Sequence, residues 1–571
     1  MGYLWFSVRW LLRQLWAPLR RSMRKRLLRD GWLELRLSGR CEEVLDPRSR
    51  LQESLRRLAG RRERQAVSLT QLERLRRLLE GDRRARGLWV TLDGLQVGWT
   101  GADRIRAVLR SLSKRGIRVV VQVRDEVSNV EALIASGADR FVLGPAAGYE
   151  AAGNASKGLF FAKTLERIGV RVEVTSAGRF KSGADALTRD RRSPDDREQV
   201  EAVIRGLDTH LVEALTEGRR LDPDRVRSGL QAAPMTAERA RSHGLVDAVA
   251  RDEEAPSIAQ ALSDADRPPK MGSAESFEAL HPRPLRRPGA PPRIGVVRIQ
   301  GVLVDRAPAG LPGSGSGIAV RDEVVDDLRA ALHDRRIGGV VLHVDSRGGS
   351  VTASDVIYGS VRRLAADKPV AVVMADAAAS GGYYVACGGH RIFAHPLTLT
   401  GSIGVFGLFP TWPRLMERLD VGQDVIRTLS GANLLDPFGG LDEAGRARLE
   451  QRVEDLYSLF VDVVAEQRGW SREAVDQVAQ GRVWLGRDAA RRGLVDQLGS
   501  LPDAVAWVRD QVSGPVGAEP VWVRSRRTPP RPAPVSDPAQ TLANWLGGSR
   551  FEQLQLMASG ARIVAWWPGL R

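Results

Sequence analysis

At 571 residues the chain is longer than one ordinary hydrophobic core supports, so two to four domains are expected. A hydrophobic fraction of 43% and a charged fraction of 27% are those of a globular protein, and the net charge of +17 indicates an anionic partner, either nucleic acid or an acidic membrane surface. The two cysteines exclude a disulfide framework and a cysteine-based zinc site, and the seven histidines lack the spacing of metal ligands. We therefore expect neither a metal nor a cofactor.

Residues 1–30 predict an amphipathic helix. Apolar side chains recur at helical spacing and a basic cluster follows them: Leu4, Val8, Leu11, Leu12, Leu15 and Leu19 with Trp5, Trp10 and Trp16 beside them, then Arg20, Arg21, Arg24, Lys25, Arg26 and Arg29. Arg9 and Arg13 interrupt the apolar run, and each would cost about 2.5–3.5 kcal/mol at the centre of a bilayer. The segment also lacks the small-residue cleavage site of a signal peptide. The pattern favours a helix that lies in a membrane interface, and a helix packed on the protein's own surface is the alternative.

The chain then alternates between predicted strands and helices. Residues 32–37 alternate as a half-buried strand does, and residues 48–86 are charged and heptad-like, which predicts helix. From Gly87 onward, short apolar runs predict strands at 88–92, 119–123 and 140–143, with a helix at about 102–114. This order is typical of βα units and a parallel sheet. The proline-rich stretch 251–292 predicts a linker.

After the linker the same order begins again, with a strand at 294–299, a helix at 322–332 and a strand at 340–344. Val119–Pro145 overlays Val370–Pro396 without gaps at a constant offset of 251. This self-similarity predicts a tandem duplication of one α/β domain. The expected parts are a membrane-association segment, an N-terminal copy, a linker, a C-terminal copy and a tail, at 1–30, 31–250, 251–292, 293–510 and 511–571.

Ser380 is the candidate nucleophile. It follows the apolar run that begins at Val370 and opens the sequence Ser380-Gly381-Gly382, after which Tyr383–Cys387 suits a buried helix. At a helix N-terminus, free N–H groups and the helix dipole can hold a developing oxyanion. On this stretch alone, a serine that only caps the helix is equally compatible.

Comparison of the two copies separates their roles. In the overlay Ser380 falls on Asn129, and the pair Gly348-Gly349 has no glycine counterpart in the first copy. Only the second copy therefore combines a candidate nucleophile with two glycine-rich turns that can supply backbone N–H groups.

Lys181 is the candidate base. A serine hydroxyl needs a base, and no histidine occupies a convincing place. The chain has only seven lysines, and it uses arginine almost everywhere else. Arginine cannot release its proton, whereas a buried lysine can. Lys181 stands just after the strand-like residues 170–174, although a solvated loop charge is the alternative.

Four motifs occur in order along the chain: Gly178–Gly183, Asp345–Asp355, Ala378–Tyr384 and Pro396–Gly407. Together they resemble the signal peptide peptidase A family in its long, duplicated form (serine peptidases of the S49 type), and the resemblance covers about residues 32–510. It implies a ClpP/crotonase-like fold in which the N-terminal copy supplies the base. One departure is the turn Asp345-Ser-Arg-Gly-Gly, where the family usually has Asn-Ser-Pro-Gly-Gly.

The resemblance also implies roles and partners. Ser380 would be the nucleophile, Lys181 the general base and Ser402 the residue that orients Lys181. The N–H of Gly381, with that of Gly348 or Gly349, would form the oxyanion hole. The expected substrates are signal peptides left after cleavage, and the expected assembly is a homo-oligomer, a ring-like tetramer. The expected location is the inner (cytoplasmic) membrane of a bacterium, with the periplasmic face favoured.

Two other functions are compatible with the fold. A non-catalytic membrane scaffold on a peptidase fold predicts a damaged Ser–Lys pair, and here both members are present. A crotonase-like acyl-CoA enzyme needs no such pair. Nucleic-acid binding, suggested by charge alone, is rejected because no module gathers basic and aromatic residues.

Overall fold

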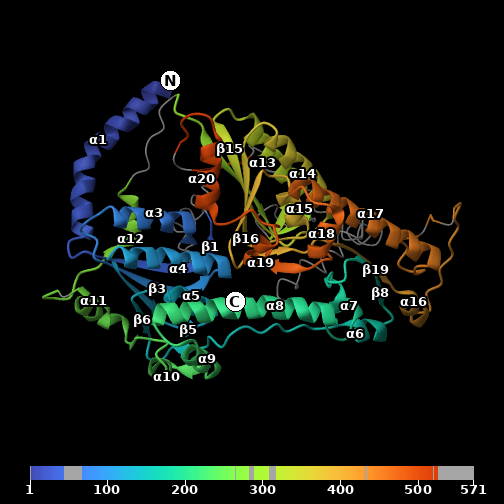
Figure 1. Ribbon diagram of the computed structural model, residues 1–571, viewed down its shortest axis with the longest axis horizontal. Coiled ribbons are helices and arrows are strands. Elements are labelled where there is room, and N and C mark those ends of the chain that lie inside the picture. The colour runs from blue at the N-terminus through green and yellow to red at the C-terminus, as the bar shows by residue number, and fades with distance from the viewer. Residues whose placement is uncertain are drawn as a thin grey trace. The chain divides into compact units, whose positions relative to one another are not determined.

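The computed structural model describes residues 2–43, 67–263, 265–281, 289–307, 317–429, 431–432, 434–517 and 520–524 (Figure 1). The described residues form two compact units. The first unit comprises the residues up to Ala155 together with Arg205–Ala290, and the second comprises Ser156–Ile204 together with the described residues from Pro291 onward. A segment of the first sequence copy therefore belongs to the second unit.

The first unit is built on a parallel sheet with the strand order β10-β6-β4-β3-β1-β11. Its strands are β1 (Trp32–Glu42), β3 (Gly87–Gln96), β4 (Arg118–Val123), β6 (Arg140–Leu143), β10 (Ala248–Val249) and β11 (Gly272–Ser273). The crossover helices include α4 (Trp99–Lys114) and α5 (Asn129–Ala135). Strands β3, β4 and β6 are buried almost throughout, as strands covered on both faces are.

The second unit repeats this sheet. Its parallel strands run in the order β21-β17-β16-β15-β12-β22; β18 pairs with the C-terminal residues of β16, and β20 pairs antiparallel with β18. Their bounds are β12 (Arg293–Gln300), β15 (Ile337–Ser346), β16 (Val370–Ala379), β17 (Arg391–Ala394), β18 (Leu399–Gly401), β20 (Val483–Leu485), β21 (Gln497–Leu498) and β22 (Val521–Trp522). The crossover helices are α13 (Arg321–His333), α14 (Val351–Ala365) and α15 (Gly381–Ala386). The mixed α/β fold with parallel sheets is as predicted.

The repeat extends beyond the segments that overlay in sequence. Strand β11 lies within the predicted linker and pairs with β1, while β22 lies within the predicted tail and pairs with β12 in the same parallel sense. The 26-residue helices α8 (Pro194–Arg219) and α17 (Glu443–Arg468) also correspond at an offset of 249. The predicted linker further contains helices α11 (Ala255–Ser263) and α12 (Ala274–Ala279). Each copy of the fold therefore ends in an edge strand that pairs with its own first strand.

Matching polar contacts hold both copies. In the first unit the Asp247 carboxylate accepts the N–H of Phe141 at 2.7 Å and pairs with Arg219. In the second unit the Asp496 carboxylate accepts the N–H of Ile392 at 2.7 Å and pairs with Arg468 at 2.7 Å. The two sets lie at offsets of 249–251, so the duplication includes the contact that fixes the helix end to the sheet.

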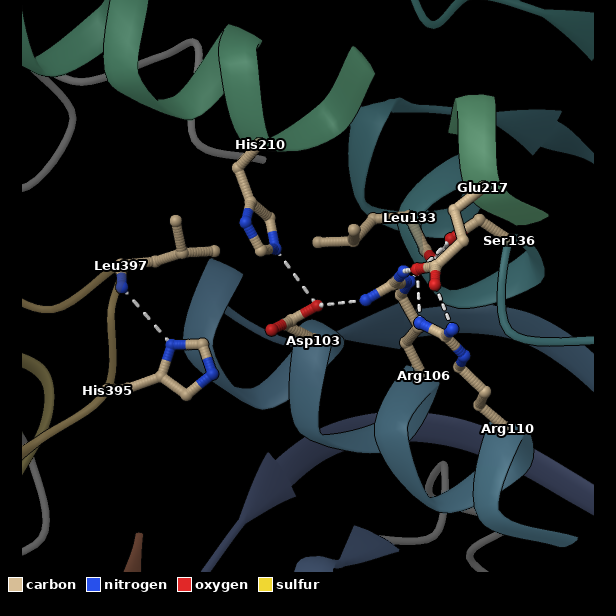
Figure 2. Close-up of polar contacts among 9 residues, drawn as sticks. All are labelled: Asp103, Arg106, Arg110, Leu133, Ser136, His210, Glu217, His395 and Leu397. Carbon is tan, nitrogen blue, oxygen red and sulfur yellow. Dashed lines mark hydrogen bonds and ion pairs between the residues drawn. The ribbon is translucent and has the colours of Figure 1, made fainter. Parts of the chain in front are cut away.

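Helix α8 packs on α4 within the first unit through an ion-pair network (Figure 2). His210 Nε2 lies 3.0 Å from an oxygen of Asp103, and Arg106 joins Asp103 to Glu217 at 3.2 and 2.9 Å. Arg110 also pairs with Glu217. Contacts of this kind satisfy charges at a helix interface, so His210 has a structural explanation.

A helix occupies the N-terminal segment as predicted. Helix α1 (Gly2–Leu27) continues through Pro18, and it exposes apolar side chains at Trp10, Leu11, Leu15, Trp16, Leu19 and Met23. Within the described part of the chain, no helix is long and apolar enough to cross a membrane. The predicted helix over 48–86 is present at α3 (Leu69–Glu80), and residues 44–66 lie outside the described residues, as does the tail from 525 onward.

The Arg468–Asp496 contact should stabilise the second unit. Arg468 is almost fully buried, and Asp496→Ala would leave its charge and the N–H of Ile392 without their acceptor. We expect a loss of about 1–3 kcal/mol in the free energy of unfolding, measured by urea denaturation. The control is Asp462→Ala, which breaks the exposed pair with Arg472 and should change stability by less than about 1 kcal/mol. An equal loss of unfolding free energy in Asp496→Ala and Asp462→Ala would contradict the stabilising role of the Arg468–Asp496 contact.

Candidate active site

Ser380 stands at the joint between β16 and α15 in a conformation that non-glycine residues rarely adopt. Its φ is 54° and its ψ is −122°. Its own N–H donates to the carbonyl of Gly401 at 2.8 Å, which fixes the turn from behind. Such a backbone costs on the order of 1–3 kcal/mol and persists only where the surroundings enforce it. The alternative in which Ser380 only caps the helix fails, because the Ser380 side chain makes no capping hydrogen bond.

The helix that follows Ser380 is anchored by its tyrosines. Tyr383 donates its hydroxyl hydrogen to the carbonyl of Leu494 at 2.8 Å, and Tyr384 donates to the carboxylate of Asp355 at 2.9 Å. Both rings are buried in the core of the second unit. This packing holds the turn in its strained form.

The structure brings Lys181 and Ser402 to Ser380. Lys181 Nζ lies 3.0 Å from Ser380 Oγ, 3.0 Å from Ser402 Oγ and 2.9 Å from the Ser402 carbonyl oxygen. Burial lowers the pKa of Lys181 from its ordinary value near 10.5 to about 7. A neutral amine has two N–H groups and one lone pair, so it can donate to both Ser402 oxygens and accept the proton of Ser380.

Lys181 follows a strand that pairs with a strand of the second sequence copy. Strand β8 (Arg171–Ala177) pairs antiparallel with β19 (Val405–Thr411), and Ala177 lies opposite Val405. Directly after β8, Gly178 has a φ of +103°, and a Cβ there would stand 2.5 Å from the backbone of Gln480. Lys181 therefore comes from the first sequence copy but from the same compact unit as Ser380.

Ser402 follows β18 and is held on the other side of the lysine. Its φ is 51°, again in the left-handed region, and its N–H donates to the carbonyl of Arg482 at 2.7 Å. Gly481, the residue before Arg482, faces the backbone of Lys181: a Cβ on Gly481 would lie 2.6 Å from the backbone nitrogen of Lys181. Glycine at this position allows the two segments to approach closely.

The two glycines of the other turn are closely packed, Gly348 against Ser380 and Gly349 against Leu303. Gly348 and Gly349 have φ values of 97° and 154°. A Cβ on Gly348 would stand 2.7 Å from the nitrogen of Gly381 and 2.9 Å from Ser380 Cβ, and a Cβ on Gly349 would stand 2.1 Å from the carbonyl oxygen of Leu303. Both positions therefore require glycine.

The N–H groups of these glycines differ. Gly348 donates its N–H to Ser346 Oγ at 3.1 Å, and Ser346 in turn donates to the carbonyl of Gly301 at 2.6 Å. Among the hydrogen bonds of the described residues, none uses the N–H of Gly349 or of Gly381. These two groups are therefore available to a ligand.

Two nearby residues escaped the sequence analysis. Ser346 lies within the motif Asp345–Asp355, and its hydroxyl fixes the Gly348-Gly349 turn. Asp345 accepts the N–H of Ala377 at 3.2 Å, and burial together with the neighbouring Asp376 raises its pKa to about 7. A charged residue at the end of a buried strand was the available signal for Asp345.

The equivalent place in the first unit has lost this chemistry. Asn129 Nδ2 donates to the carbonyl of Gly153 at 2.8 Å, and Asn129 Oδ1 accepts the N–H of Gly153 at 3.2 Å. Asn129 is not among the residues with positive φ, and its helix is capped one residue earlier by Ser128. The first copy thus closes the turn with internal hydrogen bonds.

Comparison with known proteins assigns the chain to a class. The model of peptidase family S49 matches twice, at residues 111–266 and 362–513. The serine protease SPPA, chloroplastic, of Arabidopsis thaliana is 26% identical over 78% of this chain and 66% of its own length. Protease 4 of Salmonella typhi is 31% identical over 72% of this chain and 67% of its own. The chain is a serine peptidase.

Within that class the family is defined as well. The chain belongs to peptidase family S49, and the two separate matches confirm the predicted duplication. An Enterococcus faecium relative with signal peptide peptidase in its name is 34% identical over 31% of this chain and 52% of its own. This chain thus spans about two thirds of the first two relatives and about half of the third. Among solved structures, a ClpP1 mutant from Listeria monocytogenes aligns with 16% identity and a TM-score of 0.24, over 37% of this chain and 94% of that one.

Ser402 offers a direct test of the lysine's surroundings. Ser402→Ala removes one of the three oxygens around Lys181 Nζ and leaves the carbonyl in place. A hydrogen bond to such a group contributes about 1.5–3 kcal/mol, so we expect kcat for a peptide substrate to fall by about tenfold or more with little change in KM. Ser360→Ala, which removes an exposed hydroxyl bonded only to the carbonyl of Val356, serves as the matched control. An unchanged kcat in Ser402→Ala would contradict the role.

Proposed function

We propose that the chain is an endopeptidase in which Ser380 is the nucleophile and Lys181 the general base. The observation that carries this proposal is the 3.0 Å contact between Lys181 Nζ and Ser380 Oγ, made by a lysine whose pKa burial lowers to about 7. A lysine in water would be almost fully protonated at neutral pH and could not accept a proton. Ser402 orients the amine through its two oxygens.

The chemistry follows from this arrangement. Neutral Lys181 takes the Ser380 hydroxyl proton as Oγ bonds to the scissile carbonyl carbon, and the carbonyl oxygen becomes the oxyanion. The resulting ammonium gives its proton to the leaving amine as the peptide bond breaks. Water, deprotonated by the same lysine, then attacks the acyl-enzyme and restores the Ser380 hydroxyl. No metal or cofactor takes part in these steps.

The proposed oxyanion hole consists of the N–H groups of Gly381 and Gly349. Gly381 begins helix α15, where the first N–H groups have no partner within the helix. Gly349 is favoured over Gly348 because the Gly348 N–H is already bonded to Ser346 Oγ. Two preorganised donors of this kind typically lower the barrier by several kcal/mol.

The proposal predicts a definite pH dependence. Because only neutral Lys181 accepts the proton, kcat/KM should rise with pH through about 7 and level off above it. Lys181→Met should abolish turnover of a fluorogenic peptide, and Lys181→Arg should do the same because arginine stays protonated. Ser380→Ala serves as the reference for lost activity. A Lys181→Met variant with the wild-type rate would refute the base assignment.

The lowered pKa of Lys181 also shows how a loss of activity can be distinguished from a loss of stability. The pKa of Lys181 is lower in the folded state than in the unfolded state. At a pH between about 7 and about 10, the chain therefore takes up a proton when it unfolds. Burial of Lys181 therefore destabilises the fold most below pH 7, and this penalty fades as the pH rises toward 10. At pH 7 Lys181→Met should consequently unfold no earlier on heating than the wild type, although it is inactive.

We propose signal peptides left after cleavage, and similar apolar peptides, as substrates. The motifs around Ser380, Lys181 and Gly348 support this choice, as does the name of the Enterococcus faecium relative. Replacement of Ser380 by Ala in the source cells, followed by mass spectrometry of membrane peptides, tests it: leader-derived fragments should accumulate. A homo-oligomer, a ring-like tetramer, is proposed on the same resemblance, and sedimentation of the purified chain measures its mass.

Helix α1 supports a membrane surface as the place of action, and we propose the periplasmic face of a bacterial inner membrane. Exposed Trp10, Leu15 and Trp16 precede a basic last turn that contains Arg24, Lys25 and Arg26. Apolar side chains beside basic ones are suited to insertion at the headgroup level of anionic lipid.

The membrane proposal can be tested with vesicles. The wild-type chain should sediment with vesicles that contain anionic lipid, less so at high salt, and the double variant Leu15→Asp, Trp16→Asp should lose most of this binding. Leu159→Asp, an exposed apolar residue outside α1, is the control and should bind as the wild type does. Equal binding by the double variant and the wild type would contradict the proposal.

A further inference from the structure

The side chain of Gln199 lies next to the loop that carries Lys181. Gln199 stands in the second turn of α8 and is 5% exposed. Its Nε2 donates to the carbonyl of Phe180 at 3.0 Å and lies 3.1 Å from Ser182 Oγ. Phe180 and Ser182 are the two chain neighbours of Lys181, so a single amide group contacts both of them, the first at its backbone carbonyl and the second at its hydroxyl.

The oxygen of the same amide bonds to the first residue of β20. Gln199 Oε1 accepts the N–H of Val483 at 3.2 Å. Val483 lies opposite Gly401 in the β18–β20 pair, one residue before Ser402, and the preceding carbonyl, that of Arg482, accepts the Ser402 N–H. Gln199 therefore connects the loop that carries Lys181 to β20, the strand that pairs with β18 beside Ser402.

The surrounding charges are balanced. Asp196 accepts hydrogen bonds from Ser182 Oγ and from Arg192, each at 2.6 Å, and it lies 3.1 Å from Gln199 Nε2. Arg482 pairs with Glu198 at 2.7 Å, and Arg179 lies 3.8 Å from Asp195. Each carboxylate next to the loop thus has an arginine partner, and Gln199 adds hydrogen bonds without adding a charge.

A glutamine suits this place for a chemical reason. The position needs a donor toward Phe180 and an acceptor toward Val483 on the same side chain, and the amide supplies both. A glutamate would present acceptors at both ends and would add a negative charge beside Asp196. A methionine would fill the same volume but make neither hydrogen bond.

We propose that Gln199 is a positioning residue for the reaction, which keeps Lys181 Nζ within reach of Ser380 Oγ by fixing the lysine loop to β20, next to the Arg482 carbonyl that holds Ser402. The inference rests on the proposed pairing of Ser380 and Lys181. Gln199 lies on α8 in the first sequence copy, as Lys181 does in its loop. The first copy would therefore supply two residues to a site whose nucleophile, Ser380, lies in the second copy.

Two variants test the proposal. Gln199→Met should lower kcat for a fluorogenic peptide by about 10–100-fold with little change in KM, since substrate contacts remain. In Gln199→Glu the new carboxylate favours the ammonium form of Lys181, so the rise of kcat/KM with pH should shift to higher pH. A purely structural role would lower stability without moving the pH profile.

The control is Gln467→Met. Gln467 also lies in the second unit and donates to a backbone carbonyl, that of Gly389, at 2.9 Å, but it touches neither the lysine loop nor β20. Its kcat and pH profile should match those of the wild type. If Gln199→Met does not fold, the pH profile of Gln199→Glu and a lysine pKa measured by NMR on methylated protein decide the question.

The outcomes are distinguishable from failure of the underlying mechanism. Inactive Lys181→Met together with wild-type kcat and pH profile in both Gln199 variants would overturn the role of Gln199 alone. Active Lys181→Met would overturn the Ser–Lys pairing itself, and the positioning role with it. A lowered kcat in Gln199→Met with a shifted pH profile in Gln199→Glu supports the proposal.

Discussion

The proposed mechanism depends on one constraint: a substantial fraction of the Lys181 amine must be uncharged at neutral pH. Only removal of Lys181 from solvent achieves this, because no positive neighbour is needed to explain its lowered pKa. The Ser380 hydroxyl and the two oxygens of Ser402 lie within 3.0 Å of the amine, and Gly481 lies against the backbone of Lys181. The β8–β19 pair, the glycines with positive φ and the buried helix α15 can all be understood as means of bringing these segments together without leaving room for water.

Duplication explains how such an enclosure arose. Both copies keep the same sheet order, the same long helix and the same aspartate at the sheet edge. They differ in the residues at the strand-to-helix turn and in the segment after the first copy's β7 (Gly148–Tyr149). That segment, Ser156–Ile204, belongs to the second compact unit. The second copy therefore carries Ser380, and the first copy contributes the segment that carries Lys181.

Much of this was predictable from the sequence. The constant offset of 251 identified the duplication, and the rarity of lysine in an arginine-rich chain pointed to Lys181. The motifs then supplied Ser402 and the glycines.

Other features of the fold and the site depend on long-range contacts, which the sequence does not reveal. Strands β11 and β22 are two residues long and lie among prolines, so no periodicity reveals them. Gln199 and Ser346 act through hydrogen bonds to backbone groups, which leave no side-chain pattern in the chain. The choice between Gly348 and Gly349 likewise depended on which N–H was already bonded.

The backbone of Ser380 carries a further consequence. Its φ of 54° is a conformation that the first copy abandoned: Asn129 has no positive φ and is satisfied by Gly153. The strained turn occurs with the serine in the second copy and the relaxed turn with the asparagine in the first, so only the second copy carries this local cost in stability. A glycine at position 380 would adopt the same φ without that cost. An evolutionary record of this family should therefore show the strained turn disappearing wherever the serine does.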